Sequence, residues 1–125
     1  TYHNLEIILV DDGSTDHSTA MCDEYALRDE RIKVVHKPNG GLSDARNAGL
    51  AVVSGNYVGY VDSDDWIEPQ MYEKMYAACV ENNAQVAVCR YAKAYQDRIE
   101  RGGNGRITAF DREGILKVYL SLCME

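Results

Sequence analysis

Long apolar runs are missing from this 125-residue sequence. None approaches the roughly 18–20 residues that a membrane-spanning helix needs, and the first ten residues lack the basic region and cleavage site of a signal peptide. Basic residues are also few, because 13 Lys and Arg stand against 20 Asp and Glu and leave a net charge of −7. This balance disfavours binding to nucleic acid, so we expect no nucleic-acid partner.

Two patterns of reactive side chains are absent as well. No two of the four cysteines occur at the short spacing of a zinc site. Their apolar neighbours predict that all four are reduced core residues of a cytoplasmic protein. These cysteines are Cys22, Cys79, Cys89 and Cys123. The scattered histidines have no Ser or Cys partner motif, which argues against a catalytic triad. Because the chain starts with Thr1 rather than Met, we expect it to come from a longer protein.

Strand and helix patterns alternate along the chain. Short apolar, β-branched runs predict strands at residues 5–10, 32–36, 56–61 and 85–91. Helical spacing and capping signals predict helices at about residues 17–28, 43–53 and 70–82, followed by a loop at 96–105 and an amphipathic helix after Asp111. This order predicts an α/β fold with a mostly parallel sheet and helices on both faces.

Acidic side chains gather where two of the predicted strands end. The stretch GYVDSDDW places Asp62, Asp64 and Asp65 directly after the third strand, and Asp11 and Asp12 follow the first. Ligands of open α/β sheets bind beyond the carboxyl ends of the strands. Asp62 and Asp64 can face one cation together, and oxygen ligands favour Mg²⁺ or Mn²⁺, often completed by a diphosphate. A solvated acidic turn is the alternative interpretation of this cluster.

The stretch DDGSTD at residues 11–16 supplies the second acidic group. We expect the carboxylate of Asp12 to accept hydrogen bonds from a base or a ribose, whereas Gly13 and Asp16 fit turn and capping roles. In NGGLSDARNAG at residues 39–49, a glycine turn precedes a helix, an arrangement that can present backbone N–H groups to an anion. Arg46 could pair with a phosphate or brace the acidic cluster.

These stretches, in this order and spacing, resemble family 2 glycosyltransferases of the GT-A fold. The matching segments are EIILVDDGSTD at 6–16, NGGLSDARNAGL at 39–50 and GNYVGYVDSDDWIEP at 55–69, and the resemblance is strongest over residues 3–90. It implies a Rossmann-like GT-A domain of which residues 1–125 form a part, with residues 91–125 adding a loop and a helix. The implied parent is a hexosyltransferase-like enzyme.

The resemblance also implies site residues and partners. Asp12, Arg46, Asp62 and Asp65 would bind a nucleotide-diphospho-sugar, a UDP-sugar above all, while Asp62 and Asp64 would hold Mn²⁺ or Mg²⁺. The transfer would go to a carbohydrate or lipid-linked acceptor hydroxyl with inversion, in polysaccharide or glycoconjugate synthesis. Similar enzymes work in the cytoplasm or peripherally at the cytoplasmic face of a membrane.

The sequence departs from the family pattern at both ends. The family's opening strand, which lines the base pocket, has no counterpart here, and no Glu-Asp pair follows residue 90. We therefore expect the catalytic general base to lie beyond Glu125, and this piece alone to be inactive.

Two other functions compete with the transferase interpretation. A non-catalytic, nucleotide-binding fragment fits the missing base. A receiver-type signalling domain fits IILVDDG, with Asp62 or Asp64 as phosphoacceptor, but it needs a Lys at the end of a later strand, where the sequence offers Arg90 or Lys93. The receiver interpretation also leaves NGGLSDARNAG unexplained.

Overall fold

The computed structural model describes residues 1–101. These residues divide into two compact units, and the division falls between Trp66 and Ile67. The first, here called the N-terminal unit, comprises residues 2–66, and the second begins at Ile67 and includes Thr1. The predicted helix after Asp111 lies outside the described residues.

A parallel pair of strands forms the centre of the N-terminal unit. The order is β1 (Ile7–Asp11), α1 (Ser18–Arg28), β2 (Ile32–His36) and α2 (Leu42–Leu50). β1 and β2 pair in register from Ile7 opposite Ile32 to Asp11 opposite His36. Both strands therefore end at the same edge, and the residues that follow them start side by side.

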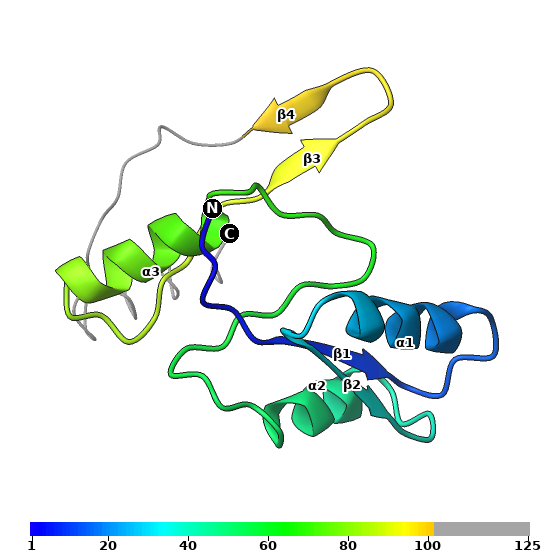
Figure 1. Ribbon diagram of the computed structural model, residues 1–125. Coiled ribbons are helices and arrows are strands. Elements are labelled where there is room, and N and C mark those ends of the chain that lie inside the picture. The colour runs from blue at the N-terminus through cyan, green and yellow to red at the C-terminus, as the bar shows by residue number, and fades with distance from the viewer. Residues whose placement is uncertain (102–125) are drawn as a thin grey trace, which may run out of the picture. The chain divides into compact units, whose positions relative to one another are not determined.

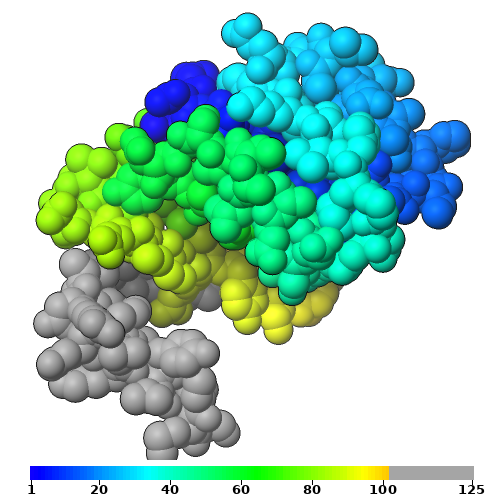
Figure 2. Space-filling view, turned by 90° about the horizontal axis from the view of Figure 1, so that it is seen from below, coloured from blue at the N-terminus to red at the C-terminus, as the bar shows by residue number. Residues whose placement is uncertain are grey.

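The two helices of this unit cover opposite faces of the strand pair (Figure 1). Successive side chains of a strand point to opposite faces. Asp11 contacts Thr19 of α1, whereas Val10 and Ile8 face Gly49 of α2. Seen from below, the cyan-green atoms of α2 lie in the foreground, with the outer side of the helix turned to solvent (Figure 2).

The second unit consists of a helix and a hairpin. It contains α3 (Met71–Glu81), β3 (Ala92–Ala94) and β4 (Ile99–Arg101), and the two short strands pair antiparallel. Cys79 is the buried residue of α3. Arg101 reaches Glu68 at 2.8 Å, which ties the end of the hairpin to the segment before α3.

The predictions of strands at residues 56–61 and 85–91 are wrong. Neither segment is a strand in the structure, and β3 begins only at Ala92. A strand exists only where its backbone N–H and C=O groups meet a neighbouring strand, and neither segment has such a ladder among residues 1–101. Their alternating apolar side chains stay largely exposed, as Tyr60 and Val88 illustrate. The local sequence pattern indicates a preference for strand conformation, but it does not show whether a neighbouring strand is present to pair with.

Smaller differences concern the loop and the cysteines. β4 occupies part of the loop predicted at 96–105, because the turn closes a hairpin in which Tyr95 N–H bonds to the Arg98 carbonyl at 2.8 Å. Cys22, Cys79 and Cys89 are free thiols, of which Cys79 is buried as predicted, Cys22 is half-buried and Cys89 is exposed. Cys123 lies outside the described residues. Within the described part of the chain, no helix is long and apolar enough to cross a membrane.

A test of the packing of α2 follows from Gly49. A Cβ at this position would lie 3.2 Å from Val10 Cγ2, so a branched side chain has no room between helix and strand. We expect Gly49→Val to lower the free energy of unfolding by about 1–3 kcal/mol through overpacking, measured by urea denaturation. Asn47→Val, at an exposed position of the same helix, is the matched control. Equal unfolding midpoints for the two variants would contradict this packing.

Candidate functional site

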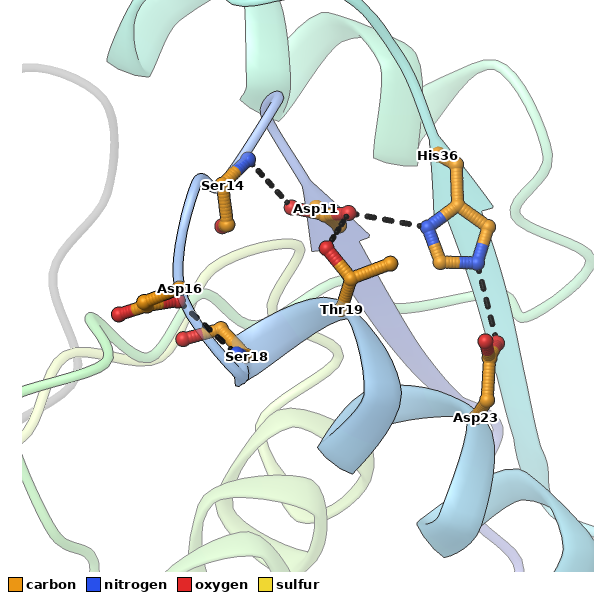
Figure 3. Close-up of polar contacts among 7 residues, drawn as sticks. All are labelled: Asp11, Ser14, Asp16, Ser18, Thr19, Asp23 and His36. Carbon is orange, nitrogen blue, oxygen red and sulfur yellow. Dashed lines mark hydrogen bonds and ion pairs between the residues drawn. The ribbon is translucent and has the colours of Figure 1, made fainter.

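Asp11 is a buried carboxylate at the end of β1. Its side chain accepts hydrogen bonds from Ser14 N–H at 2.9 Å and Thr19 Oγ1 at 2.8 Å, and it faces His36 Nδ1 at 3.0 Å (Figure 3). Hydrogen bonds from Ser14, then from His36 and Thr19, hold the pKa of Asp11 far below its usual range. Asp11 is thus an ionised structural acceptor that fixes the β1–α1 turn against β2.

His36 lies between two carboxylates. Its Nδ1 faces Asp11 and its Nε2 faces Asp23 Oδ1 of α1, each at 3.0 Å (Figure 3). A neutral imidazole has one N–H, so only the protonated ring can donate to both. Asp11 and then Asp23 accordingly raise the pKa of His36. The imidazolium links β1, β2 and α1 by charge-assisted hydrogen bonds.

Asp12 has a different set of partners. Its Oδ1 accepts from Gly40 N–H at 2.9 Å and its Oδ2 from Gly41 N–H at 2.7 Å, and the ammonium of Lys37 also bonds to Oδ1. Lys37 foremost lowers the pKa of Asp12. The carboxylate predicted to contact a nucleoside thus closes the loop between β2 and α2. Gly41, at φ +84°, is the N-cap of α2.

Gly13 allows this loop to come close. It adopts φ +71°, and a Cβ there would lie 2.6 Å from the backbone nitrogen of Asn39. The backbone of the loop after β2 therefore occupies the space that a side chain at position 13 would need, and only glycine permits this approach.

Arg46 connects α2 with the second acidic cluster. Its Nη2 pairs with Asp62 Oδ1 at 2.8 Å, and its guanidinium lies 5.7 Å from the centre of the Tyr60 ring. The structure thus brings together two predicted site residues that are 16 positions apart. The pair is partly exposed, so it positions the side chains more than it stabilises the fold.

The remaining predicted ligands lie in an exposed turn. Asp65 N–H bonds to the Asp62 carbonyl at 3.0 Å, and neither the Asp64 nor the Asp65 carboxylate enters an ion pair within residues 1–101. In the same part of the chain, no three His, Cys, Asp or Glu side chains converge as a metal site. The pairing of Asp62 and Asp64 around a cation therefore stays a prediction.

Lys37 and His36 are the site residues that reasoning from the sequence missed. A signal was present, because LVDD spans the end of the first predicted strand and VVHK spans the end of the second. In a parallel pair without stagger, the two acids lie opposite the two bases, and the register confirms Asp11 opposite His36. In this register Asp12 and Lys37, the next residue of each segment, also lie side by side and form the second ion pair.

Parallel strands flanked by helices define an α/β fold, and the acids lie at the carboxyl ends of the strands, where ligands of open α/β sheets bind. The family assignment is more specific. The chain belongs to glycosyl transferase family 2, whose family model matches residues 1–122. This membership confirms the expected Rossmann-like GT-A fold, and it accounts for the NGGLSDARNAG segment that the receiver interpretation leaves unexplained.

Curated relatives agree with this assignment. Glycosyltransferase GlyA of Streptococcus pneumoniae is 52% identical over 91 residues, which cover 73% of this chain and 13% of that protein. The uncharacterized glycosyltransferase EpsJ of Bacillus subtilis is 41% identical over 98 residues, 78% of this chain and 28% of the relative. Chondroitin synthase of Pasteurella multocida is 37% identical over 73 residues, 58% of this chain and 8% of the synthase. The chain thus spans a minor part of each relative.

The position of His36 predicts a pH dependence of stability. The pKa of His36 is raised in the folded state, so the imidazolium stabilises the fold at pH values below the ordinary imidazole pKa of 6.5. This stabilisation is lost as the pH rises through the higher pKa of the folded state. The pKa of Asp11 is lowered, so its carboxylate stabilises the fold at pH values above the ordinary pKa of 3.8. This stabilisation is lost on acidification. We expect urea midpoints to be highest between these limits and to fall above pH 6.5.

His36→Gln should abolish the decline of the urea midpoint above pH 6.5, because glutamine does not titrate. The variant should also have a lower urea midpoint at pH 5–6, because an uncharged side chain cannot replace the imidazolium between Asp11 and Asp23. His3→Gln is the matched control, since His3 is exposed and forms no ion pair within residues 1–101. An alkaline decline of unchanged size in the His36 variant would rule out this assignment.

Proposed function

We propose that the whole protein transfers a sugar from a nucleotide-diphospho-sugar, a UDP-sugar above all, to an acceptor hydroxyl. Membership in glycosyl transferase family 2 and the printed names of the relatives support sugar transfer. The observation that carries the proposal is the double attachment of α2. Asp12 binds the amides at its start, and Arg46 in its second turn binds Asp62. One short helix thus joins the two acidic clusters.

Asp12 and Arg46 are suited to the nucleotide. The Oδ2 atom of Asp12 accepts one hydrogen bond, and a carboxylate oxygen can accept two, so a base N–H or ribose hydroxyl can still bind there. The guanidinium of Arg46 has five N–H donors and uses one on Asp62, which leaves others for a phosphate. Asp65, next to Asp64 in the same turn, is the further nucleotide-sugar ligand in this proposal.

The donor set of the acidic turn suits a hard divalent cation. Asp62 and Asp64 offer only carboxylate oxygens, which fits Mg²⁺ or Mn²⁺. Arg46 occupies one oxygen of Asp62, so the other can ligate while the ion pair is kept. When bound, such a cation offsets the charge that builds on a departing diphosphate. Asp62 and Asp64 would hold it, and Arg46 would keep Asp62 oriented.

The proposal extends to the reaction and its setting. The transfer inverts the anomeric carbon in one displacement, and a carboxylate outside the residues assigned here takes the proton of the acceptor hydroxyl. The acceptor is a carbohydrate or a lipid-linked molecule in polysaccharide or glycoconjugate synthesis. The protein works in the cytoplasm or peripherally at the cytoplasmic face of a membrane. The family resemblance supports these assignments.

Asp64 gives the sharpest test of the metal. We expect calorimetry to show that UDP binds at least about tenfold more tightly with Mn²⁺ than without it, since a bridging cation adds on the order of 1.4 kcal/mol or more. Asp64→Ala should remove this gain and leave the weak metal-free binding unchanged. Asp97→Ala, at an exposed carboxylate between β3 and β4, is the control. An undiminished effect of Mn²⁺ on the Asp64 variant would refute the ligand assignment.

A further inference from the structure

Lys37 occupies an unusual position for a lysine in a loop. Its side chain is only 16% exposed, and its ammonium lies between the carboxylates of Asp12 and Asp44. The distance from Nζ to Asp44 Oδ2 is 2.6 Å, and Nζ also lies 2.6 Å from the carbonyl oxygen of Pro38. An ammonium has three N–H donors, and these three acceptors use all of them. No donor of Lys37 is left for a substrate.

Lys37 forms a bridge between Asp12 and Asp44, and this bridge closes the loop between β2 and α2 from two sides. Asp12 directly follows β1 and holds the amides of Gly40 and Gly41, while Asp44 belongs to the first turn of α2. A Cβ on Gly40 would collide with the Asp44 carboxylate and lie 2.9 Å from Lys37 Nζ. The loop is therefore packed directly against the ion pairs, and its backbone follows their geometry.

The bridge also sets the direction of the Asp12 carboxylate. Asp12 and Asp44 both approach the same ammonium, so without its positive charge they would repel each other. Lys37 and Gly40 engage Oδ1, and Gly41 engages Oδ2, which leaves one acceptor direction of Oδ2 open. Both Asp12 and Asp44 raise the pKa of Lys37, in keeping with a permanently charged bridge.

We propose that Lys37 is a positioning residue of the nucleotide site, which acts by bridging Asp12 and Asp44 and so aims Asp12 Oδ2 at the nucleoside. The inference rests on the proposed function, because it assigns Asp12 to the nucleotide. Lys37 contacts no part of the substrate. It holds the glycine loop and the Asp12 carboxylate in the arrangement that the nucleotide meets.

Calorimetry with UDP and Mn²⁺ on the whole protein separates this role from direct phosphate binding. We expect Lys37→Met to weaken UDP binding about tenfold. Asp44→Asn should also weaken it, by about three- to tenfold, because the bridge is broken while Lys37 stays. A lysine that bound phosphate directly would be released by Asp44→Asn, and UDP would then bind equally well or more tightly. That result would overturn the proposal.

The double variant Lys37→Met/Asp44→Asn tests whether the two residues act as one unit. Its loss of affinity should match that of Lys37→Met alone, because a broken bridge cannot be broken again. Additive losses would contradict the bridge. Lys33→Met is the matched control, since Lys33 belongs to β2 but pairs with Glu6, and it should leave UDP affinity unchanged.

Amide hydrogen exchange tests the bridge without any ligand. The amides of Gly40 and Gly41 should exchange at least tenfold faster in Lys37→Met than in Lys33→Met, while those of Leu9 and Val34 in the strand pair keep their protection. If the unaltered protein failed to bind UDP, the proposed function would fall, and with it the role of Lys37 in a nucleotide site. If UDP bound but the glycine amides exchanged at equal rates, only the positioning role would fall.

Discussion

The structure of the N-terminal unit depends on how two consecutive carboxylates at the end of β1 find their partners. Asp11 is the last residue of β1 and Asp12 directly follows it, and the two side chains turn to different partners. Asp11 turns toward α1, where Thr19 and the His36 imidazolium bind it. Asp12 turns toward the loop before α2 and binds its glycine amides. Two acids that would repel each other in one place instead fasten one helix to each face.

The same arrangement forms the nucleotide site of the proposed function. The inner acid is buried and bound by Ser14, Thr19 and His36, so it is structural, whereas the outer acid lies at the edge of the sheet and keeps an acceptor direction for a ligand. From there α2 extends the site, because Arg46 reaches the acidic turn through Asp62. The residues proposed to bind the nucleotide-sugar thus lie on three segments, and α2 connects them. Lys37 holds the first two of them in place.

Local sequence pattern was sufficient for β1, α1 and β2, because short apolar runs and helical spacing are properties of neighbouring residues. It failed at residues 56–61 and 85–91, where strand propensity met no partner strand in the described chain. The site shows the same division. Asp12, Arg46 and Asp62 stood out by motif, but the roles of His36 and Lys37 depend on pairs 25 positions apart, which appear only once the parallel register is known.

The central proposal is that the carboxyl end of β1, the start of α2 and the acidic turn bind one metal-bound nucleoside diphosphate. Paramagnetic broadening of amide NMR signals by Mn²⁺ in the presence of UDP tests it most directly. The account predicts strong broadening at residues 62–65, weaker broadening at Gly40 and Gly41, and sharp signals at residues 29–31, which precede β2 at the opposite ends of the strands. Broadening centred on residues 29–31, or equal along the whole chain, would contradict it.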